Sequence, residues 1–161
     1  MKFRYVLLPL ALCVLPTACS QSGTASANSD SAAKTIALTV ASSNGVHSFQ
    51  VEVASTSTEQ EKGLMFRTDI ADNGGMLFWP YPAGGGAPKE ASFWMKNTPS
   101  PLDIIFIRPN GTIARIAENA IPEDETPISS GEPVGAVLEL KGGRSAELEI
   151  AEGDKVTWTG K

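Results

Sequence analysis

The chain has 161 residues, of which 42% are hydrophobic and 19% are charged, and its formal net charge is −5 at pH 7. This length predicts a single globular domain. The acidic balance disfavours nucleic acid as a partner, because phosphate binding needs a basic stripe that the sequence lacks. One histidine and two cysteines leave few side chains for metal binding or nucleophilic catalysis.

The N-terminal segment predicts export. Lys2 and Arg4 precede an apolar run at residues 6–15. This run is about half of the ~20 residues that a membrane-spanning helix needs, so it is typical of a signal peptide. Residues 15–19 resemble a bacterial lipobox, in which residues 1–18 are removed and Cys19 carries the lipid. The alternative is ordinary signal cleavage after Ala27, and we favour the lipoprotein.

A tether and an exported domain follow the leader. Residues 19–33 are rich in Ser, Ala, Gly and Thr, which is typical of a flexible linker before a domain at 34–161. The expected location is the outer membrane, facing the periplasm, or, with ordinary cleavage, a soluble state in the periplasm or outside the cell. Cys13 is lost with the leader and Cys19 is lipidated or lost. The folded domain therefore has no thiol for a disulfide or a metal site.

The domain begins with a predicted β-hairpin and a helix. Apolar residues alternate along the strands 35–40 and 48–54, and the dipeptide Asn44-Gly45 is a typical turn between them. Residues 57–67 predict a helix, with Ser57 as its N-cap and Gln60 at N3 in a capping box.

Short strands make up most of the remaining chain. A loop rich in Gly and Pro is expected at 80–88, an acidic loop at 121–131 and a short helix at 143–150. The strand at 103–108 is apolar throughout, which predicts burial on both faces. The expected strands are 76–79, 91–97, 103–108, 112–117, 134–140 and 155–159. About eight short strands with one or two short helices predict a mainly-β fold, a compact barrel or sandwich.

Several runs of the sequence resemble one bacterial and archaeal protein family. The longest is FWMKNT at 93–98 followed by PLDIIFI at 101–107, and others are GLM at 63–65, GMLF at 75–78, VLEL at 137–140 and GD at 153–154. These residues resemble the DUF192 family, also called UPF0127, over residues 49–158. The resemblance implies a compact β-rich fold of jelly-roll type, often behind a signal peptide. It implies no reaction and no catalytic residues, because the family has no established activity.

Polar residues inside apolar strands mark the candidate binding site. Burying such groups costs several kcal/mol unless they are paired. One interpretation is an internal network with pairs such as Arg67–Asp103 and Lys96–Glu139. The other is a ligand cleft in which Lys96 and Arg67 present charge to an anionic small molecule. The predicted ligand-binding residues are Arg67, Trp94, Lys96, Asn97, Asp103 and Glu139.

Three further interpretations stay open. A hydrolase would use Asp103 and Glu139 as paired carboxylates. A periplasmic Cu(I)-binding protein would use the soft ligands of the mature chain, which are Met65, Met76, Met95 and His47. The aromatic loop with Trp79 and Tyr81 would form a contact surface, or Trp79 would simply close the core.

The sequence thus predicts a non-catalytic binding or accessory module without a cofactor. Its partner would be an unknown small molecule or an envelope protein, and its only contact with a membrane would be the lipid anchor at Cys19.

Overall fold

The computed structural model describes residues 1–2 and 35–160. The rest of the predicted leader, both processing sites with Cys19, and the predicted tether at 19–33 lie outside the described residues. Within the described part of the chain, no helix combines the length and the apolar character that crossing a membrane requires.

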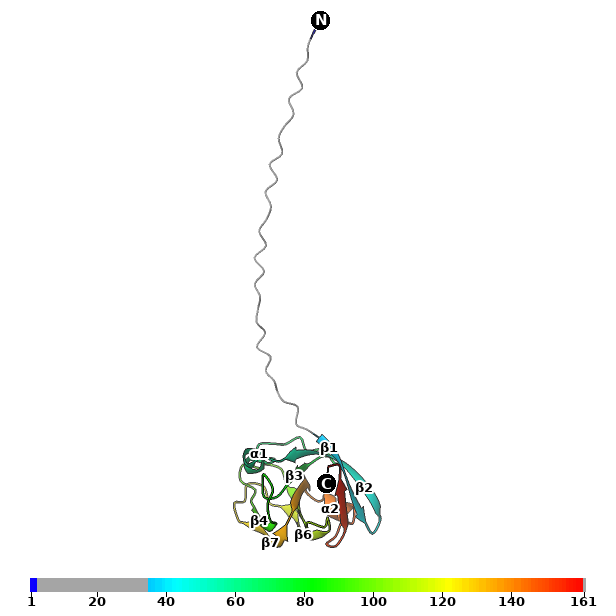
Figure 1. Ribbon diagram of the computed structural model, residues 1–161, viewed down its shortest axis with the longest axis vertical. Coiled ribbons are helices and arrows are strands. Elements are labelled where there is room, and N and C mark those ends of the chain that lie inside the picture. Colours follow the sequence, from blue (N-terminus) through cyan, green and yellow to red (C-terminus); the bar gives the residue numbers. More distant parts are fainter. Residues whose placement is uncertain (3–34, 161) are drawn as a thin grey trace. The chain divides into compact units, whose positions relative to one another are not determined.

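The domain is mainly β, as the sequence predicts. Residues 35–160 form nine strands and two short helices (Figure 1). In chain order these are β1 Thr35–Ser42, β2 Gly45–Ala54, α1 Ser57–Lys62, β3 Met76–Phe78, β4 Lys89–Phe93, β5 Leu102–Ile107, β6 Ile113–Ala120, β7 Ile128–Val134, β8 Ala136–Lys141, α2 Arg144–Glu147 and β9 Lys155–Trp158.

Seven strands form one curled sheet. Their order is β6-β5-β8-β3-β2-β1-β9, and β2 with β3 is its parallel pair. The edge strands β6 and β9 meet at one end, where the Ile113 N–H donates to the Asp154 carbonyl at 2.9 Å and the Val156 N–H donates to the Gly111 carbonyl at 2.8 Å. The sheet is therefore a half-barrel.

The two faces of this sheet bury separate apolar clusters. Along β8, Leu138 and Leu140 belong to the inner cluster, which also contains Phe49 and Ile105. Val137, the residue before Leu138, belongs to an outer cluster that includes Phe78, Ile104 and Phe106. All six residues of β5 are buried, which confirms the prediction that this strand is covered on both faces.

A small second sheet covers the outer face. It consists of β4 and β7, which pair antiparallel with an irregularity between Glu90 and Ser92. β4 contributes Ala91, and β7 contributes Val134, to the outer cluster. The sequence predicts an acidic loop up to Gly131, but residues 128–134 form β7, which contains Gly131 and Pro133. Both residues are tolerated here because β7 has one partner strand only.

Three predicted boundaries are wrong. The N-cap of α1 is Thr56 instead of Ser57, and Glu59 instead of Gln60 completes the capping box. The helix ends at Lys62, because Gly63 adopts φ 48° and leaves the helical path. The strand predicted at 91–97 ends at Phe93, and the chain then turns through Asn97, whose φ is 53°.

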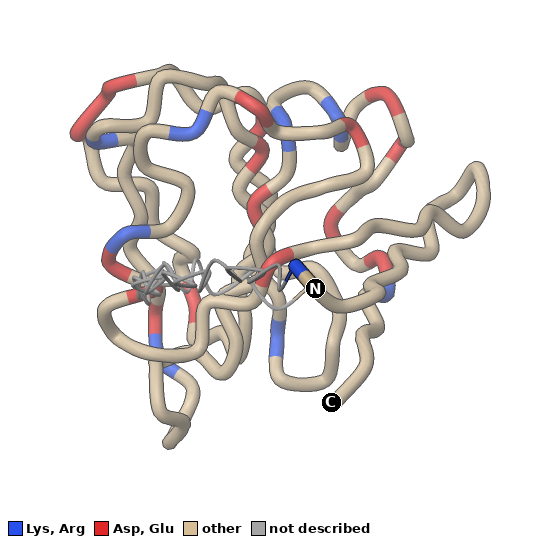
Figure 2. The backbone as a smooth tube through the Cα atoms, turned by 90° about the horizontal axis from the view of Figure 1, so that it is seen from above, with Lys and Arg blue, Asp and Glu red and all other residues tan. Residues whose placement is uncertain are grey.

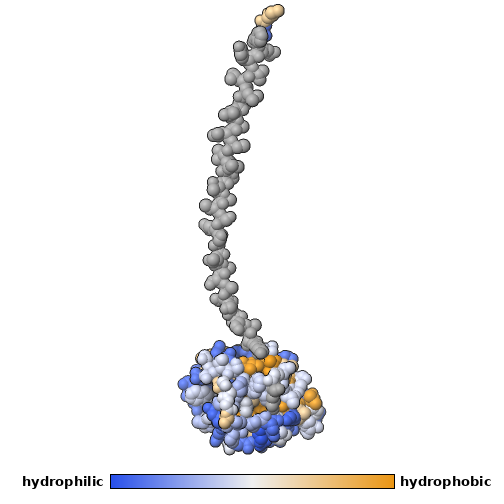
Figure 3. Space-filling model, viewed as in Figure 1, coloured by the Kyte–Doolittle hydropathy of each residue, from blue (hydrophilic) through white to orange (hydrophobic). Residues whose placement is uncertain are grey.

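Charges of both signs are interspersed around the fold. Figure 2 shows Lys and Arg positions scattered among Asp and Glu positions along the backbone. The face seen in Figure 3 is mainly hydrophilic, with smaller hydrophobic areas.

Candidate functional site

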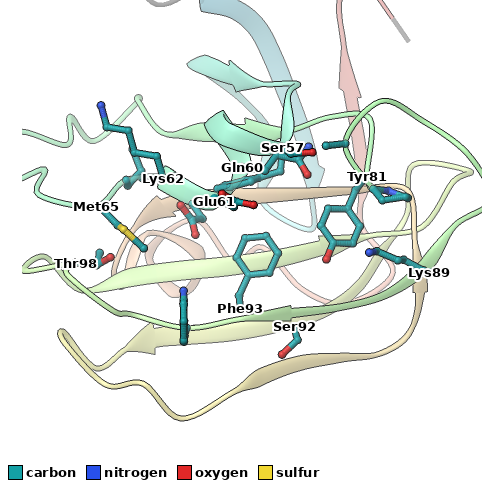
Figure 4. A pocket seen from close by; sticks show the side chains of 17 residues that line it. Ser57, Gln60, Glu61, Lys62, Met65, Tyr81, Lys89, Ser92, Phe93 and Thr98 are labelled. Atoms are coloured by element: carbon teal, nitrogen blue, oxygen red, sulfur yellow. The ribbon is translucent and has the colours of Figure 1, made fainter.

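A cavity of about 740 Å³ lies over the outer face of the half-barrel. This volume is within the roughly 300–1,000 Å³ of small-molecule sites. Figure 4 shows side chains of α1 on one side, and Phe93 with Tyr81 on the other. The lining residues are Ser57, Gln60, Glu61, Lys62, Gly63, Leu64, Met65, Phe78, Tyr81, Pro82, Ala83, Lys89, Ser92, Phe93, Trp94, Thr98 and Glu139.

Helix α1 is fixed at both ends, which positions one wall of the cavity. At its start, the Glu59 carboxylate accepts the N–H groups of Thr56 and Ser55 at 2.9 and 2.8 Å. These hydrogen bonds hold the pKa of Glu59 at about 2. At its end, Gly63 passes close to the sheet, because a Cβ atom there would lie 3.1 Å from Phe78 and 3.8 Å from Glu139 Oε2. A glycine at this point lets the chain run directly over the cavity floor.

Aromatic rings form the opposite wall. The Phe93 ring lies edge-on to Phe78 with centroids 4.9 Å apart, and Tyr81 lies 6.1 Å from Phe93. Burial raises the pKa of the Tyr81 phenol. Two ammonium groups lie over rings of this wall: Lys89 Nζ is 5.7 Å from the Tyr81 centroid, and Lys96 Nζ is 5.1 Å from the Trp94 centroid.

Glu139 supplies a carboxyl group to the floor of the cavity. It lies in the middle of β8, where Ile104 of β5 and Met76 of β3 are its cross-strand partners. The residue is 4% exposed, and its Oε2 atom is buried with no hydrogen-bond partner. Burial raises the pKa of this carboxyl from 4.5 to about 8, so most molecules carry it protonated at pH 7.

The structure brings together some of the predicted site residues. Trp94 and Glu139 line the cavity, and the ammonium group of Lys96 lies over the Trp94 ring. Asn97 follows in the adjoining turn, where its Nδ2 atom lies 4.0 Å from the sulfur of the cavity residue Met65.

Arg67 lies outside this cavity. Its guanidinium pairs with Glu52 at 2.9 Å and with Asp69 at 2.7 Å, and these carboxylates raise its pKa. It lines a second, smaller depression of about 150 Å³. The predicted Arg67–Asp103 ion pair is therefore wrong, since other carboxylates occupy the guanidinium. The predicted pair between Lys96 and Glu139 is not formed either.

Asp103 is a structural group on the other face of the sheet. It pairs in register with Leu140 of the inner cluster, whereas the neighbouring Ile104 pairs with Glu139. Because successive side chains of a strand alternate between faces, Asp103 and Glu139 point to opposite sides. Asp103 is fully buried and accepts three backbone N–H groups at 2.6–2.9 Å, from Asn119, Gly143 and Ser145. The predicted pair of catalytic carboxylates does not share a site.

The structure does not assemble the predicted copper site around His47. His47 Nε2 lies 2.7 Å from Asn44 Oδ1 in the β1–β2 hairpin. Met76 pairs with Glu52, five positions further along β2, which is roughly 16 Å from His47 at the rise of a strand. Met95 is fully buried in the outer cluster. Among residues 1–2 and 35–160, no three His, Cys, Asp or Glu side chains are placed to hold a metal ion.

The two aromatic residues of the loop have different roles: one closes the core and the other faces the cavity. Trp79 packs edge-on against Trp158 with centroids 5.9 Å apart and contacts the inner cluster, so it closes the core. Tyr81 faces the cavity. The site residues predicted from the sequence do not include the part of the wall that α1 provides. A glycine at position 63, immediately before the apolar Leu64, was the signal that the chain passes close to another element there.

Comparisons with known proteins agree with this fold. Residues 38–158 match the model of DUF192, described as Uncharacterized ACR. The crystal structure of a protein of unknown function from Novosphingobium aromaticivorans is 47% identical, with a TM-score of 0.74, and the match covers 81% of this chain and 89% of that chain. A protein from Sinorhizobium meliloti, described as a candidate transcription regulator, is 38% identical, with a TM-score of 0.74 and coverage of 80% and 97%. No curated protein matches the sequence. Because the family model spans most of the chain, the protein belongs to the DUF192 family.

Proposed function

We propose that this chain is an exported, lipid-anchored module that binds a small organic molecule in the cavity beneath α1. The observation that carries the proposal is the unpartnered Glu139 carboxyl in a cavity of about 740 Å³ with aromatic walls. Apolar walls with a few oriented polar groups are the usual composition of ligand sites. Binding is favoured over catalysis because Asp103, the second carboxyl predicted for a reaction, is committed to backbone groups on the opposite face.

Export and anchoring are the second part of the proposal. The support is the sequence alone: a basic start, a short apolar run, and a Cys at position 19 in a lipobox-like context, followed by a small-residue segment of suitable length for a tether. An anchored domain of this kind would present its cavity to small molecules of the envelope.

Native mass spectrometry of the mature protein, purified gently from the envelope fraction, tests the binding function. We expect a reproducible additional mass. In an Ala83→Trp variant, the indole is expected to occupy part of the cavity and block the ligand, so that the additional mass is lost. Ala87→Trp is the matched control, because Ala87 belongs to the same loop, is exposed and does not line the cavity. An additional mass that survives Ala83→Trp would place the ligand elsewhere, and a clean unliganded mass would favour a protein partner.

Labelled palmitate tests the anchor. The label is expected in the wild type and in Cys13→Ser, whose cysteine is removed with the leader, and it is expected to be absent from Cys19→Ser. An unlabelled wild-type protein that begins at Asn28 would instead establish ordinary cleavage after Ala27.

A further inference from the structure

Among the described residues that line the cavity, the buried side-chain polar atom without a hydrogen-bond partner is Oε2 of Glu139. Gln60 lines the cavity, but its Nε2 already donates to the carbonyls of Ala54 and Pro80 at 3.0 and 2.9 Å. The Thr98 hydroxyl donates to the Lys96 carbonyl at 3.1 Å. Glu139 Oε2, by contrast, is buried without a partner. A ligand therefore needs one group that complements a carboxyl, and the rest of its buried surface can be apolar.

The aromatic wall favours positive charge near this carboxyl. The faces of aromatic rings attract cations, most strongly where water is excluded. Two rings of the wall already attract ammonium groups of the chain itself, from Lys89 and Lys96. Phe78 and Phe93, deeper in the cavity, form an edge-to-face pair that borders the space above Glu139.

We propose that the ligand is an organic ammonium compound, whose cationic nitrogen binds the Glu139 carboxylate while its apolar body packs against Phe93 and Tyr81. This inference rests on the proposed function, because it names the class of molecule that the cavity binds. An anionic head group finds no opposite charge at the floor, because Glu139 is either neutral or negative, and it is repelled once the carboxyl ionises. The ionic groups at the mouth, Glu61, Lys62 and Lys89, are exposed and of both signs, so they select less strongly.

Binding of the cation transfers one proton from Glu139 to the solvent. The carboxyl has a pKa of about 8 in the free protein, so at pH 7 about one molecule in ten carries it ionised. Because the cation binds the ionised form, the need to remove the proton first lowers the observed affinity at pH 7 by about tenfold. The other titratable groups that face the cavity are Tyr81 from the loop, Lys89 from β4, and Glu61 with Lys62 from α1. The neighbouring strands β3 and β5 place Met76 and Ile104 beside Glu139, and neither titrates.

Three compounds with one apolar body and different head groups test the inference. These are 4-phenylbutylamine, 4-phenylbutan-1-ol and 4-phenylbutanoate, titrated into the mature protein by isothermal calorimetry. We expect the amine to bind at least tenfold more tightly than the alcohol at pH 8, and the carboxylate to bind most weakly. The amine affinity is expected to rise by nearly tenfold per pH unit between pH 6 and 7.5. Titrations in buffers of different ionisation enthalpy are expected to show release of about one proton at pH 7.

Two variants identify the group responsible. Glu139→Gln is expected to remove the preference for the amine and its pH dependence, while the alcohol binds as before. Glu61→Gln is the matched control, since it removes an exposed carboxylate at the mouth, and it is expected to change the amine affinity by less than about twofold. Equal or tighter binding of the alcohol or the carboxylate, blocked by Ala83→Trp, would overturn the ammonium inference and leave the binding function standing. Failure of all three compounds to bind at millimolar concentration would also overturn it. Native mass spectrometry of the protein from the envelope fraction would then test the proposed binding function independently.

Discussion

Replacement of Glu139 by glutamine is expected to make the protein more stable at neutral and alkaline pH. The carboxyl has a pKa of about 8 in the folded protein and an ordinary value of 4.5 when it is exposed by unfolding. Because the folded-state pKa is the higher one, the folded state binds the proton more tightly. The stability that this proton provides is fully present below pH 4.5 and is lost as the pH rises through 8.

The magnitude follows from the two pKa values. Each unit of difference corresponds to about 1.4 kcal/mol, so the free energy of unfolding of the wild type falls by about 5 kcal/mol between pH 4 and pH 9 through this group alone. At pH 7 the loss is about 3 kcal/mol, because pH 7 lies 2.5 units above the unfolded-state pKa of 4.5. Glutamine has nearly the same shape and does not titrate, so the variant avoids this loss.

Urea unfolding at a series of pH values, followed by circular dichroism, measures the effect. The quantity of interest is the difference in unfolding free energy between Glu139→Gln and the wild type, because contributions from all other titrating groups cancel in it. This difference is expected to grow by about 3 kcal/mol from pH 4 to pH 7. A difference that stays constant within about 0.5 kcal/mol over that range would refute the argument that burial keeps this carboxyl protonated.

Three further substitutions test other parts of the structure by the same unfolding assay. Asp103→Ala leaves three buried N–H groups without an acceptor and is expected to cost about 3–5 kcal/mol; a loss below about 1 kcal/mol would contradict this role. Gly75→Ala places a Cβ atom 2.2 Å from the Glu139 carbonyl oxygen and is expected to prevent folding, whereas at Gly74 the nearest atom is 3.4 Å away and alanine is tolerated. Thr56→Ala removes the N-cap of α1 and is expected to cost about 1 kcal/mol; an equal loss in Ser57→Ala would show that the cap is misplaced.

Local patterns predict the strands well and their ends less well. The alternation of β1 and β2 and the continuous apolar run of β5 are properties of a few adjacent residues, and all three strands are found close to where the sequence places them. The start of β7 is missed because its pairing with β4 overrides unfavourable local residues. The cap of α1 shifts by one residue because Thr56 and Ser57 are both suitable, and only the backbone geometry selects between them.

The candidate site shows a different limit. Glu139 and Asp103 stand out for the same reason, as carboxyls in apolar strands, yet one faces the cavity and the other faces the backbone of α2. The register between β5 and β8 makes this distinction, and a single sequence does not contain it. Lys96 and Arg67 look equivalent in the sequence, but long side chains find their partners through tertiary structure. Of these two, Arg67 finds carboxylates on the surface and Lys96 finds the ring of Trp94.

The separation of the two apolar clusters by one layer of strands has a consequence for divergence within the family. The inner cluster of the half-barrel contains no residue of α1, of the loop at 80–88 or of the β4–β7 sheet. Trp79, just before that loop, packs against it. Those segments form an exterior cover, and the cavity lies between cover and half-barrel. Under the proposed function, relatives could exchange side chains of the cover, and with them the molecule that is recognised, with little change to the inner cluster. Ligand preference and the stability of the half-barrel would then be largely separate traits, joined at Glu139 and Phe78, which lie on strands of the half-barrel and also line the cavity.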